Sequence, residues 1–350
     1  MQERQAKRHS VDRRRFLKSA AISVAATGSG ALSFPNIARA AKRYTIAFIP
    51  KSLSIPVFYF GHYGADKRAK ELGDVDIIWT GPTSEDANKQ AQIVSELTSR
   101  HVDAIAISAV AQEPLIGPIN AAVAQGIIVT GWDSDVPGSK RRLFYGVDSY
   151  KMGQTLAEQL IKLIGTSGKV VLESGSPGAT DQNTRLKGAL DTFKQYPGIT
   201  TTGPFFHQDD LLKAQQLTDN LLLGNQDAAA ILMVAGTPLF GKMDGMPELL
   251  KNHGKIKIVA TDNAATEMPF VKQGYVQVLV GQDYWGWGYQ TVSIIHNLLT
   301  NKDCKYPAFV PQGMPVITSA NVDEWIEKWK DALTPEGAAK AFAEPPIGCM

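Results

Sequence analysis

The stretch Thr45-Ile46-Ala47-Phe48-Ile49 decides the fold, because it is a short apolar run that ends at Pro50. Such a run predicts a strand buried on both faces, as in a parallel sheet. The chain from Phe58 to Leu72 then has helical spacing and stops at Gly73. A strand followed by a helix is the unit from which α/β proteins are built.

The same alternation continues along the chain. Further strands are predicted at residues 75–80, 103–108, 127–132, 169–174, 229–235, 256–261 and 276–281. Helices are predicted at residues 85–100, 114–125, 149–164, 181–195, 210–223, 242–252, 264–273 and 286–300. Repeated β-α units indicate parallel sheets with helices on both faces. The length of 350 residues favours two such domains.

The first forty residues have the layout of a bacterial export signal. A basic segment is followed by an uncharged run from Ser19 to Ile37 and then by Ala38-Arg39-Ala40. The stretch Arg13-Arg14-Arg15-Phe16-Leu17-Lys18 resembles a twin-arginine signal. A basic amphipathic helix is the alternative, but it would not explain the order of the three features. We predict export to the periplasm, with cleavage after about Ala40.

The charge balance changes once this signal is set aside. The whole chain has 36 basic and 34 acidic residues, a net charge of +2, and the first forty residues hold eight of the basic and two of the acidic ones. The remaining 310 residues therefore carry a net charge of −4. A nucleic-acid-binding protein usually has a basic excess, so we expect no nucleic-acid partner.

Two cysteines are too few for a disulfide-rich scaffold or a cysteine-rich zinc module. Whether Cys304 and Cys349 pair after export is left open by the sequence. The chain also lacks a zinc-hydrolase histidine motif, a G-x-x-x-x-G-K-[ST] phosphate loop and a strand-linked G-x-G-x-x-G fingerprint. We therefore predict a protein that is not an enzyme and that has no cofactor and no metal.

Polar residues follow most of the predicted strands. In parallel α/β sheets, ligands bind beyond the carboxyl ends of the strands. The residues at those positions are Lys51, Ser52, Ser108, Trp132, Asp133, Ser174, Ala235, Gly236, Asp262, Asn263, Gln282 and Asp283. Taken singly, Asp262 is explained equally well as a helix N-cap and as a residue that contacts a ligand. As a set, these residues predict a polar cleft for a hydroxylated ligand.

Several blocks in a fixed order resemble one family across residues 42–330. They include Ile46-Ala47-Phe48-Ile49-Pro50-Lys51, Asp103-Ala104-Ile105, Trp132-Asp133-Ser134-Asp135, Thr180-Asp181-Gln182-Asn183 and Val280-Gly281-Gln282. The chain is similar to periplasmic sugar-binding proteins of the ribose-binding type, the soluble receptors of ABC importers. The resemblance implies two Rossmann-like lobes with parallel sheets (periplasmic binding protein type I). Three crossovers would join the lobes, which close on the ligand by a hinge motion.

The resemblance also implies a division of the chain. Residues 1–40 would be the export signal. Residues 41–146 plus 283–308 would form the N-terminal lobe, and residues 147–282 plus 309–345 the C-terminal lobe. We expect a monomer.

Some blocks are closer to autoinducer-2-binding and rhamnose-binding receptors. The likeness to the autoinducer-2 receptors implies ligand contacts for Lys51, Asp133, Asp181 and Gln182. The general sugar-binding pattern adds Phe58, Ser108, Asn183, Asp262 and Gln282. Periodicity alone explains Phe58 as a core residue, and the roles of Trp285 and Trp287 are left open.

The expected function is therefore ligand capture for a membrane ABC permease. The ligand would be a small polyhydroxylated compound: an aldopentose, a deoxyhexose, a polyol or an autoinducer-2-like furanose. Two alternatives remain at this point. One is an autoinducer-2-like signal receptor that reports to a chemoreceptor, and the other is an exported sugar-acting enzyme on the same scaffold.

Overall fold

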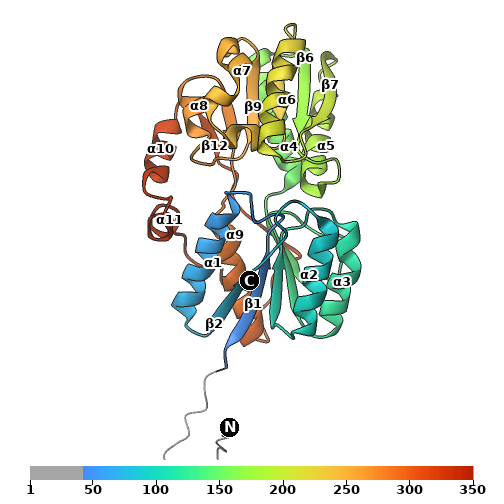
Figure 1. The fold of residues 1–350 in the computed structure, drawn as a ribbon, viewed down its shortest axis with the longest axis vertical. Helices are drawn as coiled ribbons and strands as arrows, with labels where there is room; N and C mark the ends of the chain where they lie inside the picture. Colours follow the sequence, from blue (N-terminus) through green and yellow to red (C-terminus); the bar gives the residue numbers. More distant parts are fainter. Residues whose placement is uncertain (1–41, 350) are drawn as a thin grey trace, which may run out of the picture. The chain divides into compact units, whose positions relative to one another are not determined.

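The computed structural model describes residues 42–349, which belong to one compact unit. The predicted export signal and its cleavage site lie outside the described residues. Two six-stranded sheets, each flanked by helices, form two lobes (Figure 1). Within residues 42–349, no helix combines the length and the apolar character needed to cross a membrane.

The first lobe is built on a parallel sheet with the order β11-β5-β4-β3-β1-β2. Its strands are β1 (Tyr44–Ile49), β2 (Val75–Trp79), β3 (Ala104–Ile107), β4 (Ile128–Trp132), β5 (Leu143–Gly146) and β11 (Phe309–Pro311). Its helices are α1 (Phe58–Leu72), α2 (Ala87–Ser99), α3 (Glu113–Ala124) and α9 (Gly286–Thr300). Helix α1 packs on α9, and α2 packs on α3.

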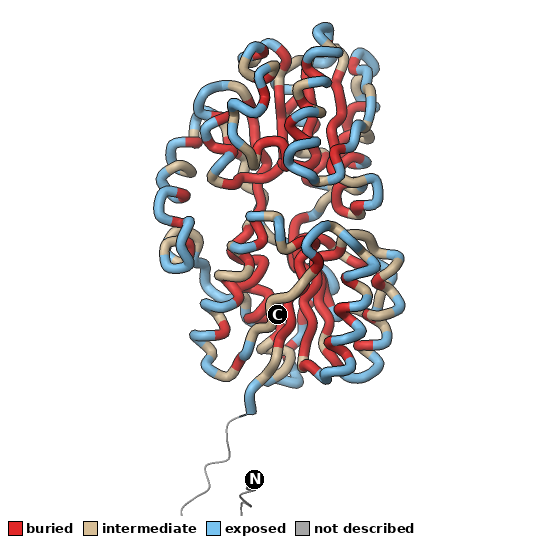
Figure 2. Tube along the Cα trace, viewed as in Figure 1, coloured by how far each residue is buried: buried red, intermediate tan, exposed pale blue. Residues whose placement is uncertain are grey.

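Strand β1 explains why helices cover both faces of this sheet. Ile46 and Phe48 belong to the apolar cluster that includes residues of α1 and α9. Ala47 and Ile49 belong to the cluster that includes residues of α2 and α3. Successive side chains of a strand point to opposite faces, so an apolar run without alternation buries both. The buried central strands and exposed outer helix faces are visible in Figure 2.

The second lobe has a sheet of order β12-β10-β9-β8-β6-β7, parallel except for the β10–β12 pair. Its strands are β6 (Ser167–Ser174), β7 (Gly198–Phe206), β8 (Ala230–Met233), β9 (Lys257–Thr261), β10 (Val278–Val280) and β12 (Val316–Thr318). Its helices are α4 (Ser149–Ile164), α5 (Thr180–Phe193), α6 (Leu211–Gly224), α7 (Pro247–Asn252), α8 (Met268–Lys272) and α10 (Val322–Lys330), with 3₁₀ turns η1 (Thr237–Phe240) and η2 (Met243–Gly245).

The chain crosses between the sheets after β5, after β10 and after β11. These crossings and the two mostly parallel sheets confirm the predicted fold class. The division into lobes differs in detail from the expectation, which placed residues 309–345 in the second lobe. Strand β11 pairs with β5 in the first sheet, and helix α11 (Pro335–Phe342) packs on α1 of the first lobe.

The C-terminal segment is held on the first lobe beyond α11. The Gln290 amide nitrogen donates to the carbonyl of Pro345 at 3.0 Å, and the backbone N–H of Ile347 donates to the Gln290 amide oxygen at 2.8 Å. A disulfide joins Cys304 to Cys349, which answers the question that the sequence left open. Disulfides persist in oxidising compartments, so this bond is consistent with an exported protein.

Candidate functional site

The carboxyl ends of the strands from both sheets face one cavity. It has a volume of about 50 Å³ and lies between the lobes. The predicted site residues that line it are Lys51, Phe58, Asp133, Asp181, Gln182, Asp262 and Gln282. Ser108 lies behind it and contacts Asp133. The topology therefore brings together residues that lie more than two hundred positions apart in the sequence.

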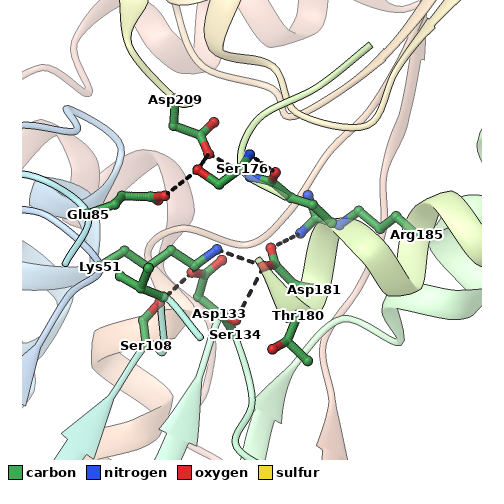
Figure 3. Close-up of polar contacts among 12 residues, drawn as sticks. Lys51, Glu85, Ser108, Asp133, Ser134, Ser176, Thr180, Asp181, Arg185 and Asp209 are labelled. Carbon is green, nitrogen blue, oxygen red and sulfur yellow. Dashed lines mark hydrogen bonds and ion pairs between the residues drawn. The ribbon is translucent and has the colours of Figure 1, made fainter. Parts of the chain in front are cut away.

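Lys51, Asp133, Asp181 and Arg185 form a group that we call the charge-matched cluster (Figure 3). The Lys51 Nζ donates to Asp181 Oδ1 at 2.9 Å and lies 3.8 Å from Asp133 Oδ2. The Arg185 Nη2 lies 3.2 Å from Asp181 Oδ2. All four side chains are almost fully buried. Two cations therefore balance two carboxylates.

Asp181 connects the lobes within this cluster. It lies in the first turn of α5 in the second lobe, whereas Lys51 follows β1 in the first. The Ser134 hydroxyl of the first lobe also donates to Asp181 Oδ1, at 3.3 Å. Burial alone would raise the pKa of Asp181, but Lys51 and Arg185 outweigh it, and this pKa is lowered. Asp181 therefore stays ionised at neutral pH.

Asp133 is placed differently. It follows β4 and has a φ of 58°, a backbone conformation that residues other than glycine seldom adopt. Its Oδ2 accepts a hydrogen bond of 2.6 Å from the Ser108 hydroxyl. Burial raises the pKa of Asp133 to about 6, against the opposing effect of Lys51. Asp133 is therefore protonated before Asp181 as the pH falls.

A second polar group joins the lobes on the other side of the cavity. Glu85 of the first lobe and Asp209 of the second, which we call the acid pair, both lie near Ser176 (Figure 3). The Ser176 Oγ is 3.1 Å from Glu85 Oε2 and 3.4 Å from Asp209 Oδ2. Asp209 also accepts hydrogen bonds from the Gln182 amide at 2.9 Å and the Thr237 hydroxyl at 2.8 Å.

Asp262 and Gln282 follow β9 and β10 and contact each other. The Gln282 Nε2 donates to Asp262 Oδ1 at 2.8 Å. The backbone N–H of Gly236 donates to Asp262 Oδ2 at 3.3 Å. Asp262 has a φ of 81°, so both aspartates that follow central strands, Asp133 and Asp262, have left-handed backbone conformations. Such outliers concentrate at binding sites.

An aromatic wall closes the apolar side of the cavity. Phe58 and Trp287 line it, and their ring centroids are 5.7 Å apart. Phe58 also meets Trp132 edge-on, with centroids 5.5 Å apart. Phe58 is thus both a core residue and a cavity residue. Trp287 belongs to this wall, whereas Trp285 lines a different cavity.

Asn183 is not brought to the cavity. It is exposed on α5, and its amide donates to the carbonyl of Pro177 at 2.7 Å. The two residues before it, Asp181 and Gln182, line the cavity, and each successive helical residue is rotated by about 100°. The helix therefore turns Asn183 away.

Sequence reasoning missed Glu85, Ser176, Arg185, Asp209 and Thr237. Arg185 had a usable signal, because it lies four residues after Asp181 in a predicted helix and so on the same face. Asp209 follows strand β7, and the hydrophobic periodicity did not predict that strand. Glu85 lies in the loop before α2, where nothing in the local sequence indicates a ligand contact.

A larger cavity, of about 740 Å³, lies at the hinge. The crossover segments 282–285 and 311–315 and the C-terminal segment line it. Lys51, Asp133 and Asp181 are absent from its lining, so we place the candidate ligand site at the smaller cavity, where the strand ends converge. Within residues 42–349, no group of three or more His, Cys, Asp or Glu side chains is arranged to hold a metal ion.

The chain is similar in sequence to sugar-binding transport proteins. The chain is 25% identical to the D-allose-binding periplasmic protein of Escherichia coli over 245 residues, which cover 68% of this chain and 78% of that protein. It is 26% identical to the D-apiose import binding protein of Actinobacillus succinogenes, over 57% of this chain and 67% of that protein.

Solved structures give the same result. An ABC transporter solute-binding protein from Burkholderia graminis in complex with D-arabinose aligns with a TM-score of 0.74 and 27% identity. The alignment covers 80% of this chain and 97% of that one. One from Agrobacterium vitis with bound D-fucose has a TM-score of 0.74 and 26% identity, with the same coverage. The family described as periplasmic binding protein domain matches residues 46–303, and the chain belongs to that family.

Proposed function

We propose that this protein is an exported solute-binding receptor of an ABC importer, which captures a small sugar, polyol or sugar-like ligand between its lobes. The observation that carries the proposal is the meeting of Lys51 from one lobe and Asp181 from the other in a single buried cavity. A ligand that contacts both sides favours the closed arrangement, since it makes its full set of contacts only there.

The chemistry of the lining suits a hydroxylated ligand. An ionised carboxylate accepts hydrogen bonds from neighbouring hydroxyls, and such charge-assisted bonds are stronger than neutral ones. Lys51 can only donate, so it suits a hydroxyl, carbonyl or ring oxygen. Phe58 and Trp287 offer apolar faces for the C–H groups of a small ring.

The size of the cavity supports a hinge motion. Pockets for small ligands usually measure about 300 Å³ or more, whereas this one measures about 50 Å³. The lobes must therefore separate to admit a sugar, and the three crossovers are the segments where they can pivot. The similarity to a periplasmic D-allose-binding protein supports the periplasm as location. The similarity to a D-apiose import binding protein and to an ABC transporter solute-binding protein supports an ABC permease as partner.

A thermal-shift screen over sugars and polyols tests this function. A ligand at 100 times its dissociation constant adds about 2.7 kcal/mol to the free energy of unfolding. We expect at least one compound to stabilise the protein, and we expect Asp133→Ala to remove that stabilisation while the ligand-free protein still unfolds cooperatively. Unchanged affinity in this variant would contradict the role of Asp133, and turnover of the sugar would contradict a receptor.

A further inference from the structure

The candidate site holds more negative than positive charge. Its lining contains five carboxylates (Glu85, Asp133, Asp181, Asp209 and Asp262) and two cations (Lys51 and Arg185). Both cations are already paired within the charge-matched cluster. The remaining carboxylates have no cation within ion-pair distance in the described part of the chain. Burying unpaired charge is unfavourable, so closure over a neutral ligand would leave this excess uncompensated.

The acid pair is where the excess is most concentrated. One hydroxyl, that of Ser176, lies within reach of both Glu85 and Asp209. A hydroxyl has a single proton, so it can donate to only one of these carboxylates at a time. Ser176 is also the one hydrogen-bond donor to Glu85 among the described residues. Asp209 has further donors in Gln182 and Thr237, so Glu85 is the carboxyl group left without a donor whenever Ser176 donates to Asp209. Neither carboxylate of the pair has a cationic partner among the described residues.

The protonation of Glu85 reflects the same shortage. Burial, followed by the charge of Asp209, raises the pKa of Glu85 to about 8, while Lys51 acts in the opposite direction. In this closed arrangement the acid pair holds a proton at neutral pH. That proton offsets one negative charge of the pair, as a cationic group would.

A second, independent feature of the cavity lacks a donor. Gln282 lines the same cavity and is 4% exposed. Its Nε2 donates to Asp262, but its Oε1 has no hydrogen-bond partner in the described part of the structure. A buried acceptor of this kind is satisfied when a ligand brings an N–H or O–H group. Glu85 on one side of the cavity and Gln282 Oε1 on the other are therefore buried acceptors that an N–H or O–H group of a ligand would satisfy.

We propose that the ligand is an amino sugar or amino polyol, whose protonated amine binds between Glu85 and Asp209 beside Ser176. This inference rests on the proposed function and names the ligand class of the same site. An ammonium group has three N–H donors and no acceptor, which matches two carboxylates and one hydroxyl oxygen. The hydroxyl groups of such a ligand are left for Asp133, Asp262 and Gln282.

Matched pairs of sugars test the proposal by calorimetry at pH 7. The probes are D-glucose and D-glucosamine, D-galactose and D-galactosamine, and D-mannose and D-mannosamine. In at least one pair we expect the amino sugar to bind about tenfold tighter or more, as one new charge-assisted contact would give. Closure over the neutral sugar should take up a proton at the acid pair, seen as an enthalpy that depends on the buffer, and closure over the amino sugar should take up less.

The variant Glu85→Gln should bring the affinity ratio of that pair close to one. Glu96→Gln is the matched control, because Glu96 is exposed on α2 of the same lobe, and it should keep the wild-type ratio. A neutral sugar that binds as tightly as its amino partner in every pair would overturn the inference and leave the proposed function standing. If no sugar or polyol of either kind binds, both proposals are overturned.

Discussion

The charge-matched cluster and the acid pair connect the same two lobes by opposite means. In the first, Lys51 and Arg185 hold Asp181 ionised and the lobes are joined by a buried ion pair. In the second, Glu85 and Asp209 approach each other with one serine hydroxyl between them. Closure leaves no unpaired charge in the first, whereas the second opposes closure until it receives a proton or a cationic group.

The largest expected effect is on the charge-matched cluster, through Asp181→Asn. This variant leaves Lys51 and Arg185 buried without their shared partner, and breaking a buried ion pair costs about 3 kcal/mol or more. We expect the free energy of unfolding, measured in urea, to fall by that amount and ligand-induced stabilisation to be lost. Asp191→Asn is the control on the same helix: Asp191 is half-buried, but its partners Lys187 and Lys194 are exposed, so its loss should cost about 1 kcal/mol or less. Equal effects in the two variants would contradict the account.

A rise in pH should act on the acid pair instead. The pKa of Glu85 is about 8 in this closed arrangement and has an ordinary value of 4.5, to which separation of the lobes should return it. Closure therefore takes up a proton between these values, and it is opposed as the pH rises through 8. The charged and polar groups around Glu85 are Asp209, Asp181, Lys51 and Ser176.

We expect the ratio of open to closed ligand-free protein to rise by about a hundredfold between pH 6 and pH 9, read from tryptophan fluorescence or solution scattering. The effect of Asp133, whose pKa is raised to about 6, has the same sign but is complete at lower pH. Glu85→Gln should remove the transition near pH 8. Its persistence in that variant would assign the transition to another group.

The smallest expected effect comes from Ser176→Ala. The hydrogen bond from Ser176 lowers the pKa of Glu85, so its removal should move the opening transition to higher pH. A lost hydrogen bond to a charged group is worth about 1.5 kcal/mol, which corresponds to a shift of about one pH unit. Thr192→Ala, a buried hydroxyl on α5 outside the cavity, is the control. A shift to lower pH would contradict the assignment.

Much of the fold followed from local patterns, as β1 and α1 illustrate. The apolar run Thr45–Ile49 and the helix that begins at Phe58 lie where they were predicted. The strands that were missed lacked this signal. Strand β7 is half-exposed at the edge of its sheet and contains Pro204, and β5, β11 and β12 have three or four residues each. Their positions depend on the sheet they join, which the local sequence does not describe.

The residues of the candidate site also divide into those that local sequence patterns could predict and those that they could not. Lys51, Asp133, Asp262 and Gln282 could be predicted because they follow strands, and parallel strands end at one edge. Glu85 could not, because its place beside Asp209 results from how the two lobes meet. The return of the C-terminal segment to the first lobe was missed for the same reason, since Cys304 and Cys349 are joined across 45 positions.

The central claim is that a ligand closes the two lobes through groups on both sides of one cavity. Small-angle scattering of the protein, with and without the most stabilising sugar, tests it most directly. We predict a smaller radius of gyration on ligand addition, absent in Asp133→Ala. A ligand that binds with no change in the radius, or that compacts the Asp133→Ala variant equally, would contradict the account.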